Sequence, residues 1–176
     1  PFLGMLMALA AARAVRKLTG LEAGIKWPND VEAGGFKVAG ILPEAGTGPS
    51  GLEWVVIGLG INLTVPESAF PAELKGRASS IAGLAGASPS RDAVLDAVLC
   101  ELGSLYLSFL DGEDDKLIEE ISSISTIEGK SITVFAGETS YPATALRTET
   151  SGALTVIDGE GKMISLLSGE VSIRRS

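Results

Sequence analysis

The stretch from Ile25 to Asn62 constrains the fold of this chain more than any other part of the sequence. It contains two short apolar runs, Lys37–Leu42 and Trp54–Ile57, on either side of a loop rich in Gly and Pro. Apolar runs of this length, containing β-branched residues and bounded by turn residues, are typical of strands. We therefore expect two neighbouring, buried strands at the centre of the fold.

Polar residues and glycines interrupt this apolar pattern. Lys26, Asp30 and Lys37 stand at the ends of the predicted strands, and Gly58 and Gly60 follow a run that is otherwise fully apolar. Glycine inside a strand costs backbone entropy and packs nothing, so its presence indicates that another backbone or a ligand comes close. The sequence therefore predicts a binding site along these strands.

Four short motifs follow one another along the chain. They read KWPND at Lys26–Asp30, KVAGIL at Lys37–Leu42 with Glu44 after it, GLGIN at Gly58–Asn62, and SGEVSIR at Ser168–Arg174. In this order and at these spacings, the motifs resemble those of the biotin protein ligases, which use ATP to attach biotin to a carboxylase. The resemblance extends from near residue 1 to the end of the chain.

The biotin loop of that family has no counterpart in this sequence. Biotin protein ligases have an Arg- and Gly-rich loop, with the pattern GRGRxGR, upstream of the KWPND motif. In the family this loop folds over biotin and the phosphate of the adenylate, and nothing of its kind occurs here. We therefore expect the C-terminal portion of such a ligase without its biotin-binding N-terminal half, whether by natural loss or by truncation.

Helical patterns flank the predicted strands. Residues 2–19 read as a helix that Gly20 ends, and residues 90–110 and 114–122 read as two further helices. The first half of the helix at 2–19 is apolar all round, which implies that something outside this chain covers its outer side. An uncovered apolar helix also makes a homodimer an open alternative. Ala45–Gly51 reads as a flexible loop, and residues 63–89 as a loop with a short helix at Ser79–Leu84.

From about Ile124 the apolar period changes to two, which is typical of strands. Five short strands within about fifty residues favour a small β barrel, and they are Ser131–Phe135, Tyr141–Thr148, Ala153–Ile157, Met163–Leu167 and Val171–Arg174. The family resemblance implies that this barrel is SH3-like. The predicted fold is therefore α+β. Residues 1–123 form part of a catalytic domain with a mixed sheet and packing helices, of the class II aminoacyl-tRNA synthetase and biotin ligase type, and residues 124–176 form the barrel.

Composition excludes several kinds of chemistry. The net charge of −8 argues against a nucleic-acid surface, and the apolar run Phe2–Ala12 is too short to cross a membrane, which takes ~20 residues. Without histidine, a Ser-His-Asp triad and a His-ligated zinc are ruled out. The single cysteine, Cys100, indicates a reducing compartment, so we expect a cytoplasmic protein. Cys100 lies in an apolar helical pattern, and we expect it in the core.

The resemblance implies a reaction in two steps. The carboxylate of biotin attacks the α-phosphate of ATP to give biotinyl-5′-AMP and pyrophosphate. A lysine of a biotin carboxyl carrier protein then attacks the mixed anhydride, takes the biotinyl group and releases AMP. The first step brings two anions together, so the site needs fixed positive charge. Biotin, ATP and Mg²⁺ are the implied small-molecule ligands. The alternative is a ligase-like binding or scaffold module that has lost the biotin loop and does not catalyse.

Lys37 and Asp30 are the catalytic residues that the resemblance implies. Lys37 is expected to place its ammonium between carboxylate and phosphate, unless it is an exposed hairpin lysine. Asp30 is expected to orient Lys37 or to bind Mg²⁺, since hard cations prefer oxygen ligands, unless it forms an ordinary Asx turn. Lys26 is a candidate for phosphate contact, with a structural salt bridge as the alternative. Glu170 and Arg174 match residues that reach the nucleotide from the small domain, with a salt bridge at the rim as the alternative.

The remaining matches to the family concern the ligand cradle. Gly40 and Ile41 are expected to offer backbone and apolar contact to the rings of biotin. Gly58 and Gly60 are expected to let the chain approach the ligand closely. Asn62 is expected to hydrogen-bond the adenine edge through its paired donor and acceptor.

Overall fold

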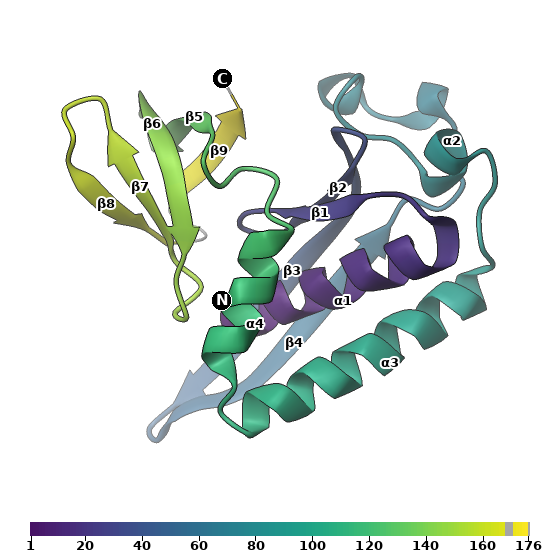
Figure 1. The fold of residues 1–176 in the computed structure, drawn as a ribbon, viewed down its shortest axis with the longest axis horizontal. Coiled ribbons are helices and arrows are strands. Elements are labelled where there is room, and N and C mark those ends of the chain that lie inside the picture. Colours follow the sequence, from purple (N-terminus) through teal and green to yellow (C-terminus); the bar gives the residue numbers. More distant parts are fainter. Residues whose placement is uncertain (168–170, 176) are drawn as a thin grey trace.

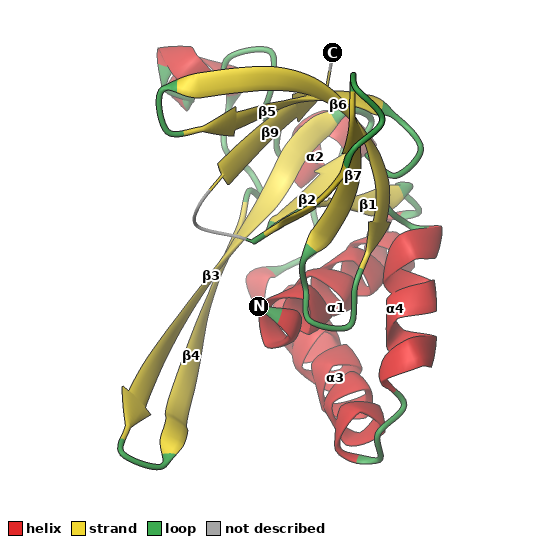
Figure 2. Ribbon diagram, turned by 90° about the vertical axis from the view of Figure 1, so that its left-hand side faces the viewer, coloured by secondary structure: helices red, strands yellow, loops and turns green. Residues whose placement is uncertain are grey.

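The computed structural model describes residues 1–167 and 171–175, which fold into helices packed on one antiparallel sheet and a second antiparallel sheet beside them (Figure 1). The first sheet has the strand order β1-β2-β3-β4, with β1 at Ala23–Lys26, β2 at Asp30–Ala33, β3 at Phe36–Gly48 and β4 at Gly51–Ile61. Three long helices lie on one side of it (Figure 2), namely α1 at Phe2–Thr19, α3 at Arg91–Leu110 and α4 at Asp114–Ser123. The α+β class is confirmed.

The first sheet is antiparallel at every strand pair, so the expected mixed sheet is wrong. Strand β2 was not predicted, because its sequence DVEA is short and half polar. The chain turns at Pro28 and Asn29 and then runs back between β1 and β3, where Val31 pairs with Ile25 on one side and Ala39 on the other. Pairing on both sides supplies the stability that four residues of weak strand propensity lack.

The hairpin of β3 and β4 extends further than the sequence indicates. Residues 45–51, predicted to be a flexible loop, form the outer rungs of the hairpin, in which Ala45 pairs with Val55 and Gly48 with Gly51. Figure 2 shows the outer end of this hairpin diverging from the helices. As a consequence β4 is not a buried strand: Trp54 is 51% exposed and Leu52 is 64% exposed. Strand β4 is also an edge strand of the first sheet, because its outer edge pairs with no strand among the described residues.

Helix α1 is buried on all sides by this chain alone, so the expectation of an outside cover is wrong. Alanines such as Ala8, Ala10 and Ala12 are fully buried, and α1 lies between the sheet and α3. Small side chains let the helix approach both neighbours closely. Gly20 ends the helix in the left-handed conformation, and its backbone N–H donates to the carbonyl of Arg16.

Helix α3 is the apolar helix that remains exposed. Its inner face is buried on α1 through Val94, Val98 and Leu105. Its outer face exposes Cys100, against the expectation that this thiol lies in the core, together with Leu95, Leu99, Tyr106, Leu107 and Leu110. By length and composition alone α3 is the one described helix that could cross a membrane.

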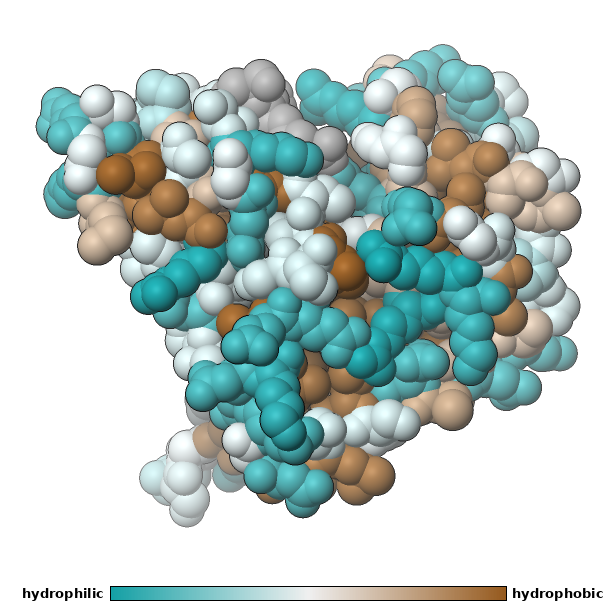
Figure 3. Space-filling view, in the orientation of Figure 1, coloured by the Kyte–Doolittle hydropathy of each residue, from teal (hydrophilic) through white to brown (hydrophobic). Residues whose placement is uncertain are grey.

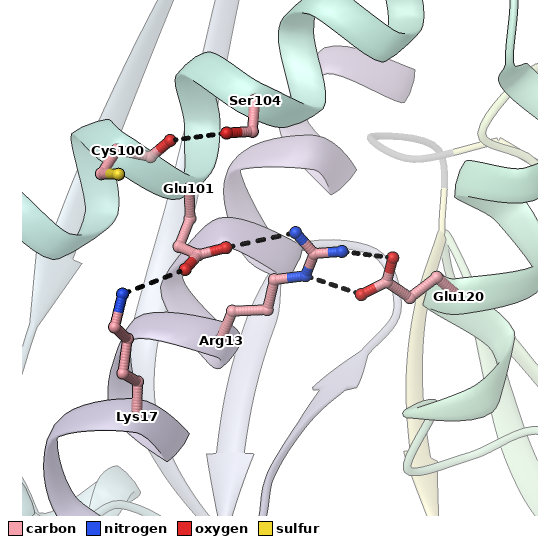
Figure 4. A network of polar contacts seen from close by, with 6 residues as sticks. All are labelled: Arg13, Lys17, Cys100, Glu101, Ser104 and Glu120. Atoms are coloured by element: carbon pink, nitrogen blue, oxygen red, sulfur yellow. Dashed lines mark hydrogen bonds and ion pairs between the residues drawn. The ribbon is translucent and has the colours of Figure 1, made fainter.

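An ionic network fastens the three long helices together (Figure 4). Arg13 of α1 donates to both carboxylate oxygens of Glu120 on α4, at 2.6 and 2.5 Å, and to Glu101 of α3 at 3.2 Å. Lys17 lies 3.8 Å from Glu101. The hydrogen bonds from Arg13 to Glu120 raise the pKa of the guanidinium above its ordinary value. Figure 3 shows hydrophilic side chains gathered over these helices.

The segment between β4 and α3 is irregular, as expected, and contains a short helix near the predicted place. It has single 3₁₀ turns at Glu67–Ala69 and Ala72–Leu74 and the helix α2 at Ile81–Ala85. The hydroxyl of Ser80 caps α2 by accepting from the backbone N–H of Gly83 at 3.2 Å. Ser90 caps α3 in the same way, with Ala93 as the donor.

The second sheet contains all five predicted strands but does not form a closed barrel within the described residues. Its order is β8-β7-β6-β5-β9, so β8 and β9 are its outer strands. The bounds are Ser131–Ala136 for β5, Thr139–Thr148 for β6, Leu154–Asp158 for β7, Met163–Leu166 for β8 and Val171–Arg175 for β9. The SH3-like barrel is therefore not confirmed. The division of the chain at residues 123 and 124 stays a proposal.

The connection after α4 joins the two sheets. Ile25 of β1 donates its N–H to the carbonyl of Ile124 at 2.9 Å, and Thr126 returns an N–H to the carbonyl of Ile25 at 2.8 Å. From the same end of the sheet, the indole N–H of Trp27 donates to the carbonyl of Gly152 at 2.9 Å. Residues 124–126 therefore lie alongside β1 and form an isolated β-bridge with it.

Gly24 is required where this connection crosses β1. A Cβ on Gly24 would lie 2.5 Å from the carbonyl oxygen of Ile124. This separation is shorter than real Cβ contacts. We expect Gly24→Ala to lower the free energy of unfolding by about 1–3 kcal/mol in urea titrations. The matched control is Gly103→Ala in the exposed part of α3, where nothing lies within 4 Å. There alanine should raise the free energy of unfolding by about 0.5–1 kcal/mol. Equal stability of Gly24→Ala and wild type would contradict the packing.

Candidate functional site

Four predicted site residues form one row across the first sheet. Lys26 pairs with Asp30, Asp30 with Gly40, and Gly40 with Gly60. The neighbouring row, which contains Ile25, Val31 and Ala39, is buried against α1. Successive residues of a strand point to opposite faces, so the row that starts at Lys26 faces away from the helices. We call this surface the open face.

Lys37 lies over Gly40 in this row. Its Nζ is 2.5 Å from Oδ1 of Asp30, and a Cβ on Gly40 would lie 3.1 Å from the same Nζ. A side chain at residue 40 would therefore push the ammonium aside. The pairing of Gly40 with Gly60 extends a flat glycine surface beside the ammonium.

The backbone of Lys37 is held on its other side by the segment after β4. Its N–H donates to the carbonyl of Arg77 at 2.8 Å, and its carbonyl accepts from the N–H of Ser79 at 3.0 Å. The side chain of Lys37 is 37% exposed. The backbone of Lys37 is therefore fixed by hydrogen bonds to Arg77 and Ser79, and its ammonium is held by Asp30. It is not a freely solvated hairpin lysine.

Lys26 forms a salt bridge, which was the alternative to a phosphate contact. Its partner is Glu32, a residue that the sequence did not single out. The Nζ of Lys26 lies 3.5 Å from Oε1 of Glu32. Glu32 is 5% exposed and faces the same way as Asp30, two residues earlier on β2. A period-two reading of Asp30–Ala33 would have placed both acids on one face, but the missing strand prediction hid this signal.

Gly58 and Gly60 are exposed and are not required by packing. A Cβ on Gly58 would lie 3.5 Å from the carbonyl oxygen of Leu42, and one on Gly60 would lie 4.0 Å from that of Gly40. Both are ordinary contacts. Neither glycine has a positive φ. The folded chain thus tolerates a larger residue at both positions, and the free space lies on the open face.

Two predicted contacts lie away from this row. The side chain of Ile41 is 1% exposed on the helix side of the sheet, and its backbone exchanges hydrogen bonds with Asn29 at 2.8 Å. The side-chain amide of Asn62 donates to the carbonyl of Ser79 at 3.3 Å. Its backbone N–H donates to the carbonyl of Val38, and its carbonyl accepts from the N–H of Ile81. Asn62 thereby holds the segment that in turn holds Lys37.

The two nucleotide contacts predicted near the last strand are those of Glu170 and Arg174. Glu170 lies outside the described residues. Arg174 lies on β9, where its backbone pairs with Thr133. Their roles toward a nucleotide stay predictions.

The described residues do not form a metal site of their own. No group of three Asp, Glu, Cys or His side chains comes together in this part of the chain, and Oδ1 of Asp30 is already occupied by Lys37. Because Mg²⁺ is usually bound by one or two carboxylates together with substrate phosphates, the expected contact between Asp30 and Mg²⁺ stays a prediction.

An apolar groove lies elsewhere, between α1, α3 and the edge of β4. It measures about 640 Å³ and is lined mainly by apolar side chains such as Leu6, Trp54, Ile57, Leu102 and Tyr106. Glu53 is the one charged residue in its lining. This groove has no pair of chemically reactive groups, whereas the open face brings two lysines and two carboxylates together.

Comparison with known proteins supports the same reading of the sequence motifs. Residues 1–62 match the Biotin/lipoate A/B protein ligase family. The bifunctional ligase/repressor BirA of Bacillus subtilis is 34% identical over 110 residues, which are 62% of this chain and 34% of BirA. The biotin–acetyl-CoA-carboxylase ligase of Mycobacterium tuberculosis is 41% identical over 81 residues, 46% of this chain and 27% of that protein.

The fold extends this likeness over nearly the whole chain. The biotin protein ligase of Aquifex aeolicus superposes with a TM-score of 0.84 at 27% identity, covering 99% of this chain and 75% of that one. The chain is related to the biotin protein ligases. The same ligase in complex with biotin and ATP gives a TM-score of 0.83, covering 99% of this chain and 72% of that one. This relative of the biotin protein ligases spans about a third of the length of the Bacillus and Mycobacterium proteins it matches.

The close contact between Gly40 and Lys37 can be tested without any ligand. In Gly40→Ala the new methyl group displaces the ammonium from Asp30. We expect the acetylation of Lys37 by an N-hydroxysuccinimide ester, followed by mass spectrometry, to become roughly fivefold faster, the equivalent of about 1 kcal/mol of lost ion pairing. Gly60→Ala is the matched control and should leave the rate unchanged, because its methyl group contacts only a carbonyl at 4.0 Å. An unchanged rate in Gly40→Ala would contradict the placement of Lys37.

Proposed function

We propose that this chain contributes the adenylate-binding strands of a biotin protein ligase, which activates biotin with ATP to biotinyl-5′-AMP and transfers it to a lysine of a biotin carboxyl carrier protein. The observation that best supports this is the position of the Lys37 ammonium over Gly40, beside the glycine surface that Gly40 forms with Gly60. It is supported further by the Aquifex ligase, which shares the fold and whose complex contains biotin and ATP.

The proposed chemistry requires the protein to bring two anions together. The carboxylate of biotin and the α-phosphate of ATP repel each other, and an ammonium between them lowers that repulsion at no cost of reorganisation. Lys37 is proposed for this place, with Asp30 holding the ammonium in position. Lys26, which lies in the same row, is proposed to contact the phosphate. Asp30 remains the proposed carboxylate for a Mg²⁺ ion shared with the phosphates, and no step here is routed through that ion.

The glycines of the open face are proposed to accept the ligand itself. Gly40, Gly58 and Gly60 carry no side chains above the sheet, so an acyl-adenylate lying on this surface contacts the backbone directly. Asn62 is proposed to reach the adenine while its amide also fixes Ser79. Ile41 is proposed to act through its backbone, since its side chain lies on the helix side.

Lys37→Ala tests the proposed adenylate site. We expect isothermal titration with biotinyl-5′-AMP to show binding by wild type and a loss of roughly a hundredfold in Lys37→Ala, about 3 kcal/mol, because a charge-assisted contact to the phosphate is removed. The control is Lys162→Ala, an exposed lysine in the turn before β8, which should bind as wild type does. No binding by a folded wild-type chain would contradict the proposal.

The alternative is a ligase-like binding module without catalysis. It predicts that biotinyl-5′-AMP binds but that no biotinyl group reaches an acceptor. Transfer of labelled biotin to a carrier domain separates the two, since a ligase labels the carrier and a binding module does not. A homodimer stays a prediction, and the exposed face of α3, not α1, is now its candidate surface. The cytoplasmic location stays a prediction.

A further inference from the structure

Glu32 is the one charged residue classed as buried in the part of the chain whose burial is described. One carboxylate oxygen, Oε2, accepts a hydrogen bond from the hydroxyl of Thr126 at 3.1 Å, and the other, Oε1, lies 3.5 Å from the ammonium of Lys26. A buried carboxylate is costly unless it is paired. The two contacts therefore give Glu32 a definite orientation, yet the proposed chemistry assigns it no task.

Four charged side chains lie together at this end of the open face, and each forms its ion pair with a residue that is not directly opposite in the strand register. Lys26 stands directly opposite Asp30 in the strand register, and Glu32 stands directly opposite Lys37. The ion pairs, however, are Lys26 with Glu32 and Lys37 with Asp30. Directly opposed residues have Cβ atoms about 5 Å apart, so each lysine also has a second acid within reach.

We propose that Glu32 is a positioning residue that binds Lys26 and thereby leaves Asp30 to Lys37. Without Glu32, the ammonium of Lys26 turns to the acid directly opposite and shares the carboxylate of Asp30. The two ammonium groups then converge on one partner and neither is held where an adenylate needs it. This inference rests on the proposed function of the open face.

Thr126 extends the arrangement to the connection between the two sheets. Its backbone N–H donates to Ile25, one residue before Lys26, while its hydroxyl donates to Glu32. Residues 124–126 also cover Gly24, which pairs with Glu32 across the strands. The connection therefore both buries Glu32 and orients its carboxylate, so the placement of Lys26 depends on the chain that leads into the second sheet.

The inference is tested by the affinity for biotinyl-5′-AMP in Glu32→Gln, Lys26→Ala and the double variant. Glutamine keeps an acceptor for Thr126 but loses the charge that holds Lys26. We expect Glu32→Gln to bind roughly tenfold more weakly than wild type. In the Lys26→Ala background the same change should have no further effect, because the residue through which Glu32 acts is gone. Glu160→Gln, in the exposed turn between β7 and β8, is the matched control and should bind as wild type does.

The sign of the effect separates the other roles that Glu32 could have. A carboxylate that only repels the anionic ligand predicts tighter binding in Glu32→Gln, and a purely structural one predicts lower stability with unchanged affinity. Either result, or full additivity with Lys26→Ala, overturns the inference. Should Glu32→Gln fail to fold, Thr126→Val reports on the same orientation. It removes the hydroxyl donor at similar volume and should weaken binding roughly threefold, whereas unchanged binding overturns the inference.

Lys37→Ala distinguishes a failure of this inference from a failure of the proposed function. If wild type does not bind biotinyl-5′-AMP, both fall together. If wild type binds and Lys37→Ala loses binding while Glu32→Gln does not, the adenylate site stands and only the role of Glu32 is refuted.

Discussion

The alternation of the first sheet is the constraint on which the rest of the structure depends. Four antiparallel strands bring Ile25, Val31, Ala39 and Ile61 into one row, and burying the first three of these under α1 provides hydrophobic stabilisation. Because side chains alternate along a strand, the next row must face outward. The charges and glycines of the site are thus placed on the open face by the same burial that stabilises the sheet.

The charges on that face are arranged in pairs and not as a bare cationic patch. Lys37 is held by Asp30, and Lys26 by Glu32, so the four groups sum to zero net charge. Pairing limits the cost of placing ammonium groups on a partly buried surface and fixes their positions. An anionic ligand then meets oriented cations, which is the property that an acyl-adenylate site needs.

Helices α1 and α3 are both rich in apolar residues but have opposite surroundings. Helix α1, rich in alanine, is enclosed by the sheet and α3, whereas α3 buries only one face and exposes leucines, Tyr106 and Cys100. The network around Arg13 ties α1, α3 and α4 into one layer. Through α4 and residues 124–126 this layer also fixes the chain that orients Glu32.

The sequence alone predicts the three long helices, the strands β3 and β4 and the five strands of the second sheet, because periodicity and caps are local properties. It did not determine β2, whose four residues are strand only through pairing on both sides, or the length of the β3–β4 hairpin, whose glycine-rich tip is ordered by its own ladder. It also could not show which helix is enclosed, since hydropathy does not say which neighbour covers a face. The folded chain alone reveals that Glu32 lies beside Lys26, that Ile41 points to the core and that Lys37 lies over Gly40. Each of these depends on strand register and on a crossing chain distant in sequence, and no local pattern encodes either.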